Sequence, residues 1–176
     1  MIVIMSDSHV ESKIIEEIKN QYSQKAEVFI HCGDSELSSQ SNIWEGVHVV
    51  AGNCDYDSGY APMKIIKVKD LNILITHGHL QFVSPSRLGN LHELAREYSA
   101  DIVCFGHIHR PIAEIQNQTL YLNPGSLSQP RGNWPDKMYL LLDIEESEEK
   151  RIFKLSYRTL DHKAIEDLQI KLEIKK

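Results

Sequence analysis

The chain has 176 residues, of which 41% are hydrophobic and 25% charged, and a formal net charge of −6 at neutral pH. This length and balance predict one globular domain over residues 1–176 with a substantial core. No apolar stretch reaches the ~18 residues of a membrane span, and the net acidity argues against general binding to nucleic-acid backbones.

The cysteines and the N-terminus bear on the compartment. Cys32, Cys54 and Cys104 are an odd number without a CxxC pair, which argues against a disulfide framework and against a zinc finger. The first apolar run is short and no basic region precedes it, so it does not resemble a signal peptide. We therefore expect a cytoplasmic protein.

The first part of the chain predicts a strand, a helix and a second strand. Three isoleucines at the spacing of one helical face predict the helix over about residues 11–22. Apolar runs at 2–5 and 28–30 flank it, and this order predicts parallel pairing of the two strands. The polar segment 35–42 is interpreted as a loop or a short helix.

The middle of the chain predicts two tight hairpins with an amphipathic helix between them. Residues 65–68 and 71–76 flank a Lys-Asp turn, and residues 113–115 and 120–122 flank a polar turn. Between the hairpins, apolar residues at helical spacing predict a helix over 88–98.

The C-terminal part adds strands. Apolar runs at 138–144 and 152–157 flank the acidic run 145–149, which predicts a hairpin with a solvated turn. From Asp161 onward the spacing fits a helix or a strand, and we expect a helix that frays. Early strand–helix alternation followed by late hairpins predicts two mixed sheets packed face to face, with helices outside.

Five apolar runs each end directly before side chains that bind hard or borderline metals. The runs are residues 2–5, 28–30, 47–50, 73–76 and 102–105, and the side chains after them are Asp7, His9, Asp34, Asn53, His77, His107 and His109. Ligands of open α/β sheets bind at the carboxyl ends of strands, so we expect these seven side chains to meet there. They suit Mn, Fe, Zn, Ni or Co and suffice for two ions.

Local features indicate how these ligands are presented. Gly33 permits a sharp turn before Asp34, whose two carboxylate oxygens make it the natural bridge between two ions. His107 and His109 point to opposite faces if the chain is extended, and reach neighbouring ions only if it turns at Gly106.

The charge of such a centre favours phosphate. Two divalent ions bring +4, Asp7 and Asp34 bring −2 and a bridging hydroxide −1, which leaves the site near +1. A two-metal centre of this kind holds a phosphate oxygen and directs hydroxide at phosphorus in line.

Five motifs occur in an order that resembles the calcineurin-like metallophosphoesterases, and among them the small YfcE/MJ0936-like phosphodiesterases. They are Asp7-Ser8-His9, Gly33-Asp34, Gly52-Asn53-Cys54-Asp55, His77-Gly78-His79 and Gly106-His107-Ile108-His109. Each motif alone is common, but the ordered set is specific, and the resemblance covers residues 1 to about 131.

The resemblance implies a four-layer αββα sandwich and a dimetal phosphodiesterase acting on a small phosphate ester. We expect Mn first, with Ni, Fe, Zn or Co as alternatives. It also implies two ligand sets that share Asp34. One is Asp7, His9, Asp34 and His109; the other is Asp34, Asn53, His77 and His107.

Four residues are expected to act on substrate: Asn53, Cys54, His79 and Arg131. The commonest family pattern has His as proton donor where this chain has Cys54, so the general acid stays open between the thiol and water. A role for Cys54 as nucleophile is the less favoured reading. His79 is expected to line the pocket or to hydrogen-bond a ligand. Arg131 either pairs with a phosphate oxygen or is a surface residue.

Other candidates have structural explanations. His31 and His48 are expected in the core, His92 and His162 in solvent, and Asp55 in a turn. Cys32 and Cys104 are expected to fill space between apolar residues.

Two alternative functions stay open: a non-catalytic protein-interaction module of the same fold, like the retromer coat subunit of this family, and a phosphomonoesterase or protein phosphatase. Exposed sheet edges leave a homo-oligomer open as well.

Overall fold

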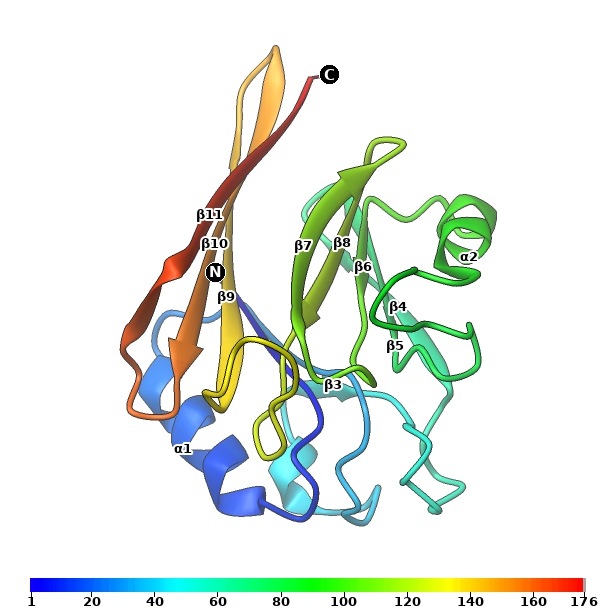
Figure 1. Cartoon of the computed structure of the whole chain (residues 1–176), viewed down its shortest axis with the longest axis vertical. Coiled ribbons are helices and arrows are strands. Elements are labelled where there is room, and N and C mark those ends of the chain that lie inside the picture. Colours follow the sequence, from blue (N-terminus) through cyan, green and yellow to red (C-terminus); the bar gives the residue numbers. More distant parts are fainter. Residues whose placement is uncertain (176) are drawn as a thin grey trace.

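Two mixed β-sheets packed face to face form the centre of the molecule (Figure 1). A computed structural model describes residues 1–175 of the chain. The first sheet has six strands in the order β11-β10-β9-β1-β2-β3, and the second has five in the order β4-β5-β6-β8-β7. The predicted αββα architecture is therefore confirmed.

The strands of the first sheet are β1 (Ile2–Met5), β2 (Val28–His31), β3 (Val47–Val49), β9 (Met138–Glu146), β10 (Lys150–Thr159) and β11 (Ala164–Lys175). Those of the second sheet are β4 (Met63–Val68), β5 (Leu71–Thr76), β6 (Ile102–Cys104), β7 (Pro111–Gln116) and β8 (Thr119–Pro124). The helices are α1 (Ser12–Tyr22), the single-turn η1 (Asn42–Trp44) and α2 (Leu91–Glu97).

Each sheet combines three parallel strands with antiparallel neighbours. Strands β1, β2 and β3 pair in parallel, as the strand–helix–strand pattern predicts. Strands β5, β6 and β8 are also parallel to one another, while β4 and β7 close the second sheet as antiparallel edges. Parallel neighbours end at the same side of a sheet, so the six loops that follow these parallel strands are brought to one end of the sandwich.

Apolar side chains form three layers of core. The largest cluster lies between the sheets and contains residues such as Ile4, Ile75 and Leu140. Val3 and Met5 of β1 point the other way and pack under helix α1, whose Ile15 is fully buried. A third cluster joins α2 to the outer face of the second sheet. Side chains alternate between the two faces along each strand, so each sheet has apolar residues on both of its faces.

The C-terminal segment is a strand, and the predicted helix was wrong. Residues 164–175 form β11, the edge strand, which pairs antiparallel with β10 over almost its whole length. Leu168 and Ile174 are buried against the core between the sheets. Strand β10 would otherwise leave its edge hydrogen-bonding groups unpaired, and this tertiary requirement decides between two patterns that fit the local sequence equally.

Among residues 1–175, none of the helices has both the length and the apolar character needed to cross a bilayer.

Candidate metal centre

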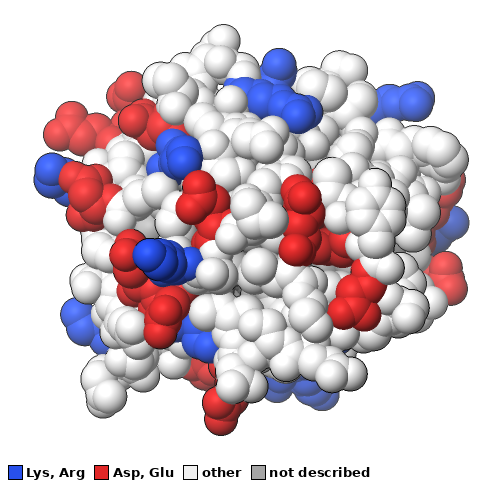
Figure 2. Space-filling view, turned by 90° about the horizontal axis from the view of Figure 1, so that it is seen from below, with Lys and Arg blue, Asp and Glu red and all other residues white. Residues whose placement is uncertain are grey.

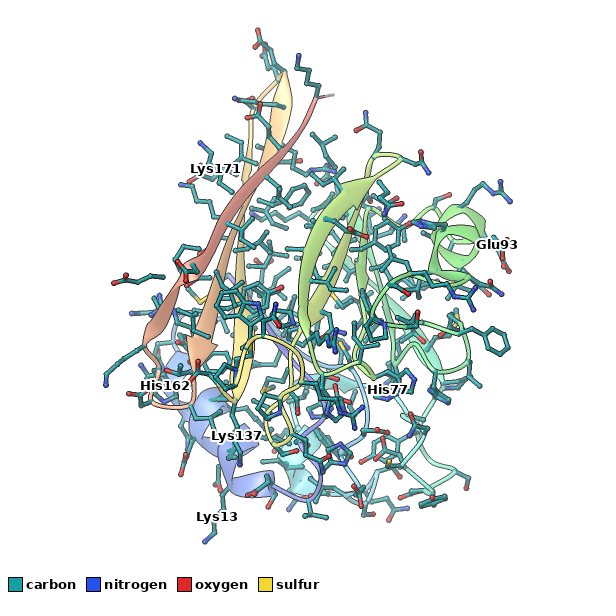
Figure 3. The ribbon with its side chains drawn as sticks, in the orientation of Figure 1. Lys13, His77, Glu93, Lys137, His162 and Lys171 are labelled. Atoms are coloured by element: carbon teal, nitrogen blue, oxygen red, sulfur yellow. The ribbon has the colours of Figure 1, made fainter. Side chains whose placement is uncertain are left out.

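All seven predicted ligands follow the carboxyl ends of parallel strands. Asp7 and His9 come after β1, Asp34 after β2, and Asn53 after β3. His77 comes directly after β5, where Figure 3 shows it among the loops at the lower end of the second sheet. His107 and His109 follow β6. The two sheets therefore contribute to one region from opposite sides.

Four of the predicted ligands form a compact group. Asp7, His9, Asp34 and His109 each offer one ligand atom, and these atoms all lie within 4.8 Å of one another. Nε2 of His109 is 3.0 Å from Oδ1 of Asp7. These four residues are one of the two predicted ligand sets, which we call the first ligand group.

The other predicted ligands lie beside this group. Nε2 of His77 is 3.3 Å from Oδ2 of Asp34, and the His77 and His107 rings have centroids 5.3 Å apart. Asn53 is exposed at the pocket wall, and its side-chain amide donates to Sγ of Cys54 at 3.3 Å. Asp34 thus contacts residues of both predicted sets.

The backbone is strained where it carries the ligands. Five of the seven predicted ligands have φ in the left-handed region: Asp7, His9, Asp34, His107 and His109. Non-glycine residues rarely adopt this conformation, and such outliers cluster at functional sites. The left-handed turns after Gly106 are also what keeps His107 and His109 from pointing to opposite faces, as an extended chain would require.

Two glycines allow the ligand loops to approach one another. A Cβ on Gly52 would lie 2.1 Å from Oδ1 of Asp34, and one on Gly106 would lie 2.0 Å from Oγ of Ser6 and 2.8 Å from Oδ2 of Asp7. No larger side chain fits at either position without moving the carboxylates.

Hydrogen bonds orient three of the histidines. Nδ1 of His77 is bonded to the carbonyl of Cys32 at 2.8 Å, and Nδ1 of His109 to the carbonyl of Gln129 at 2.7 Å. Nδ1 of His9 lies 2.6 Å from Oε1 of Glu36. Partners of this kind fix the ring and leave Nε2 free to bind a metal.

The loop after β8 supports the other side of the centre. Ser126 and Ser128 both donate their hydroxyls to the carbonyl of Asp7, at 2.9 and 3.0 Å. The side-chain amide of Asn123 donates to the carbonyl of Gly106 at 2.7 Å. The end of β8 and the loop after it therefore hold the strained ligand segments in place.

The centre is negatively charged and has unused polar atoms. Asp7 and Asp34 are 0% and 2% exposed, and neither carboxylate pairs with a Lys or Arg of residues 1–175. Oδ2 of Asp7, Nε2 of His9 and Nε2 of His77 are buried without a hydrogen-bond partner. Buried charges and orphaned polar atoms are costly unless a cation balances them, so the residues present fit divalent ions.

The pKa shifts of Asp34 and His77 also favour a cation at this centre. Burial disfavours the charged form of Asp34, but its contacts with His77 and the Cys54 amide outweigh burial and hold its pKa below the ordinary value. Burial likewise favours a neutral His77 ring, yet the carboxylates of Asp34 and Asp7 raise its pKa. In the ion-free protein, the two carboxylates therefore favour a proton on His77, at the position where a metal ion would bind.

A pocket of about 330 Å³ opens onto the first ligand group. Its walls include Asn53, Cys54 and Arg131, three of the four residues expected to act on substrate. Arg131 is exposed and its backbone N–H donates to the carbonyl of His109 at 3.0 Å. The pocket therefore brings the expected substrate residues to the same opening as the ligands.

Cys54 and His79 have different environments, since Cys54 lines this pocket and His79 is not among its lining residues. Burial, followed by the carboxylate of Asp34, raises the pKa of the Cys54 thiol to about 11, which disfavours a thiolate nucleophile in the ion-free protein. His79 is half-buried, its Nδ1 has no partner, and its ring lies 5.4 Å from that of His77. Burial and the neighbouring His77 lower the pKa of His79, which favours a neutral ring.

Asp55 has a larger role than the predicted turn. Its carboxylate accepts the backbone N–H groups of Asp34, Ser35, Glu36 and Gly52 at 2.7 to 3.0 Å. It also accepts the Ser35 hydroxyl at 2.9 Å. These bonds hold together the loops that carry Asp34 and Asn53. The position of Asp55 in the GNCD motif was a signal for this role, but its partners Asp34, Ser35 and Glu36 are about 20 residues away in the chain.

The remaining histidines divide between prediction and correction. His31 is fully buried and His48 half-buried, as predicted. The prediction that His92 and His162 face solvent was wrong. Both are half-buried, with Nδ1 bonded to a tyrosine hydroxyl: His92 to Tyr121 at 2.9 Å and His162 to Tyr139 at 2.8 Å. Sequence patterns do not reveal these pairs, because each histidine bonds a tyrosine that is distant in the chain.

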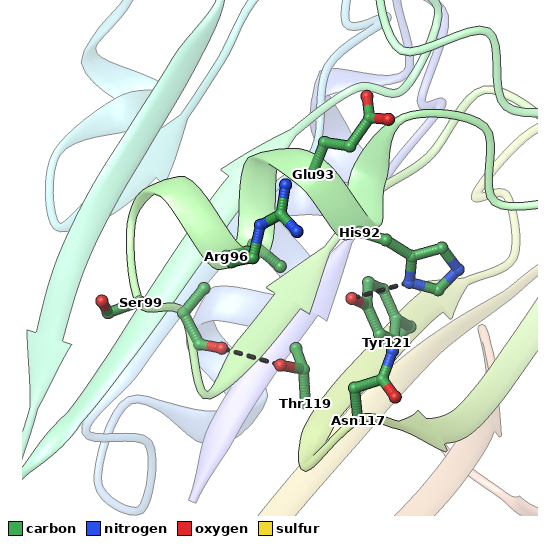
Figure 4. A pocket seen from close by; sticks show the side chains of 9 residues that line it. His92, Glu93, Arg96, Ser99, Asn117, Thr119 and Tyr121 are labelled. Carbon is green, nitrogen blue, oxygen red and sulfur yellow. Dashed lines mark hydrogen bonds between the residues drawn. The ribbon is translucent and has the colours of Figure 1, made fainter.

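A larger pocket, about 500 Å³, lies away from the predicted ligands, between α2 and the β7–β8 hairpin (Figure 4). None of the seven predicted ligands lines it, and its polar groups include His92, Arg96 and Thr119. Two of these are already engaged, since His92 bonds Tyr121 and Thr119 donates to the carbonyl of Ala100 at 3.0 Å. The volume of a pocket therefore does not by itself identify the candidate site.

The surface charges are mixed on the face shown in Figure 2. Lys and Arg side chains lie scattered among Asp and Glu side chains there, without gathering into one basic area. The net charge of −6 agrees with this distribution.

The chain belongs to the calcineurin-like phosphoesterase superfamily, whose domain model matches residues 1–147. This is a family of metal-dependent phosphoesterases, so the chain falls in a class of hydrolases that use divalent metals.

Similar proteins agree with this membership. The chain is 35% identical over 144 residues to YsnB of Bacillus subtilis, a probable metallophosphoesterase, covering 82% of this chain and 84% of YsnB. It is 32% identical over 105 residues to the phosphodiesterase YfcE of Escherichia coli, covering 55% of this chain and 52% of YfcE. A predicted phosphoesterase from Streptococcus pneumoniae TIGR4 has a similar structure, with a TM-score of 0.88, 37% identity and coverage of 99% and 97% of the two chains.

Proposed function

We propose that the protein is a dimetal phosphodiesterase acting on small phosphate esters, with Mn²⁺ as its first-choice ion. The observation that carries the proposal is that ligand atoms of Asp7, His9, Asp34 and His109 lie within 4.8 Å of one another, beside buried polar atoms that lack hydrogen-bond partners. The similarity to YfcE, which is named a phosphodiesterase, favours diesters over monoesters.

The proposed ligand assignment has two sets. Asp7, His9, Asp34 and His109 hold one ion, and Asp34, Asn53, His77 and His107 hold the other. When bound, two divalent ions supply Lewis acidity and a nucleophilic hydroxide at neutral pH. Asp34 contacts both sets, which supports its role as the shared ligand.

The chain's own residues bind and orient the phosphate group. Asn53 and Arg131 line the pocket and present an amide and a guanidinium to phosphate oxygens. The neutral ring of His79 lies beside His77 and His107 and can donate a hydrogen bond to a phosphoryl oxygen. Preorganised donors of this kind stabilise the charge that builds in the transition state.

Proton delivery to the leaving group differs here from the family's commonest pattern. Cys54 lines the pocket where the family's commonest pattern has His, and its thiol is protonated in the ion-free protein. We propose that the enzyme favours substrates with good leaving groups or receives the proton from water. The free thiols also agree with action in a reducing compartment such as the cytoplasm.

A metal screen tests the function. The purified protein, stripped with chelator, is reloaded separately with Mn, Ni, Co, Fe or Zn and assayed on an aryl phosphodiester and the matching monoester. We expect turnover of the diester above that of the monoester, strongest with Mn. Preference for the monoester would favour a phosphomonoesterase. No turnover with any of the five metals would favour the non-catalytic interaction module.

A further inference from the structure

A second group of ligand atoms lies in the pocket wall, next to the first ligand group. His9, Glu36 and Cys54 each offer one atom, and the three atoms lie within 4.8 Å of one another. All three side chains line the pocket, with His9 and Cys54 half-buried and Glu36 exposed. We call these residues the wall group. They differ from the first ligand group in supplying a sulfur atom.

The wall group is held in place by the surrounding loops. Oε1 of Glu36 is 2.6 Å from Nδ1 of His9, so these two side chains already face each other. The backbone N–H of Glu36 donates to Asp55 at 2.7 Å, and Glu36 adopts a left-handed φ of 56°. The backbone N–H of Cys54 donates to Oδ1 of Asp34 at 2.7 Å. Strained and tethered backbone on both sides fixes the separation of the three ligand atoms.

The charges around Cys54 favour a cation. Cys54 shares the pocket wall with the carboxylates of Asp34 and Glu36. A divalent ion would offset these negative charges and stabilise the thiolate. Thiolate ligands select borderline and soft ions such as Zn²⁺ over the hard ions Mg²⁺ and Mn²⁺.

We propose that His9, Glu36 and Cys54 form an additional site for a thiophilic divalent ion, such as Zn²⁺ or Cd²⁺, and that its occupation inhibits the enzyme. On binding, the S–H bond of Cys54 breaks, a sulfur–metal bond forms and the proton passes to solvent, without any redox change. Three protein ligands leave a fourth position for water, as tetrahedral zinc sites with an open position do.

Inhibition follows from the shared histidine, and this part rests on the proposed function. His9 belongs to both the first ligand group and the wall group. A neutral imidazole binds one metal ion, so an ion in the wall group competes with the catalytic centre for His9. An ion there also narrows the pocket that would admit substrate.

Titration with Co²⁺, a spectroscopic substitute for Zn²⁺, tests the site without relying on activity. Cobalt bound to a thiolate has a near-ultraviolet charge-transfer band that cobalt bound to oxygen and nitrogen lacks. We expect the wild-type protein to show this band and to bind one equivalent more than Cys54→Ser, which should show no band. Glu36→Gln should lower the affinity for the cobalt ion that gives this band by more than about tenfold. Loss of an outer partner of a metal already costs about tenfold in affinity, and Glu36 is proposed as a direct ligand. Glu45→Gln, which alters an exposed glutamate outside the wall group, is the matched control.

Several results would overturn the proposal. A band that persists in Cys54→Ser would assign it to another thiol. Equal stoichiometry in the two proteins would place Cys54 in the catalytic centre or leave it unligated. The inhibition arm uses Zn²⁺ added to Mn-loaded enzyme, with each variant normalised to its own Mn activity. Cys54→Ser should need about tenfold more Zn²⁺ for half-inhibition. If the protein hydrolyses no ester, the proposed function fails, while the band and the stoichiometry still decide the wall group.

Discussion

The carboxylate of Asp55 accepts the backbone N–H of Asp34 at 2.7 Å, across 21 residues of chain. It also accepts the N–H of Gly52 at 2.8 Å, so one side chain ties the loop after β2 to the loop after β3. The ligand geometry at Asp34 therefore depends on a residue that binds no metal in either proposed set. Such outer partners orient ligands and tune their affinity.

Replacing Asp55 by Asn tests this dependence. Asn retains the shape but presents only one carbonyl oxygen where the carboxylate accepts five hydrogen bonds. We expect metal affinity to fall by about 10–100-fold, measured by competition with a chromophoric chelator. Asp57→Asn is the matched control, because Asp57 accepts the N–H groups of Ser39 and Gly59 in an exposed turn. Equal losses in the two variants would reduce the effect to general loop stability.

Asp34→Asn should abolish metal binding and activity together. The substitution removes the charge of the carboxylate that both proposed ligand sets share. We expect turnover to fall by about 10²-fold or more, since losing one preorganised electrostatic group costs that much. Metal content by elemental analysis should fall in parallel. Asp167→Asn, on the exposed face of β11, is the control. Full turnover in Asp34→Asn would exclude the bridging role.

Gly106→Ala should disturb the centre through close contact. The new Cβ would lie 2.0 Å from Oγ of Ser6 and 2.8 Å from Oδ2 of Asp7. We expect a loss of about 1–3 kcal/mol in the free energy of unfolding, together with weaker metal binding. In Gly46→Ala the new Cβ meets nothing within 4 Å, although φ is +73°. This control should lose stability through backbone strain while keeping its metal affinity, and a loss of metal there too would point to global rather than local damage.

Acid should destabilise the ion-free protein through His31. Burial lowers the pKa of His31 to about 4, and this outweighs the opposing charges of Asp7, Asp55 and Asp34. Nδ1 accepts the N–H of Gly33 and Nε2 bonds Oγ of Ser8, an arrangement that requires a neutral ring. Above the unfolded pKa of about 6.5 both states are neutral. Below it the unfolded chain takes up a proton that the folded one excludes, so stability falls as pH drops from about 6.5 to about 4.

The size of this effect is about 3 kcal/mol over the whole window. Urea unfolding in the presence of chelator, at several pH values between these limits, measures it. His31→Gln keeps a donor for Ser8 and does not titrate. The slope of its free energy of unfolding against pH should therefore be smaller by the contribution of one bound proton. Identical slopes in the two proteins would show that His31 does not carry the dependence.

Cys54→His should improve proton delivery. The imidazole would stand where the family's commonest pattern has its proton donor, and general acids contribute about 10²–10⁴-fold. We expect up to about 10²-fold faster hydrolysis of an alkyl phosphodiester and little change for an aryl one, whose leaving group needs no proton. Cys54→Gln, which lacks a titrating group, should show no such selectivity. A uniform gain on both substrates would instead indicate altered binding.

Much of the architecture follows from local periodicity. The apolar run 2–5 is strand β1 to the residue, and the hairpin prediction around Lys69 and Asp70 matches β4 and β5 within two residues. The segment after Asp161 was ambiguous because its apolar spacing satisfies both a helix and a strand. The unpaired edge of β10 resolved it, and that edge exists only once the sheet is assembled.

The same division holds at the candidate centre. The sequence by itself determined the chemistry of the ligands, their position after parallel strands and the family they resemble, because residue type and strand period are local properties. Only the tertiary structure decided that Asp55 braces Asp34, that Glu36 and Cys54 lie beside His9, and that Gly106 must lack a side chain. These relations join loops from different strands, and their distances are set by how the two sheets pack and twist.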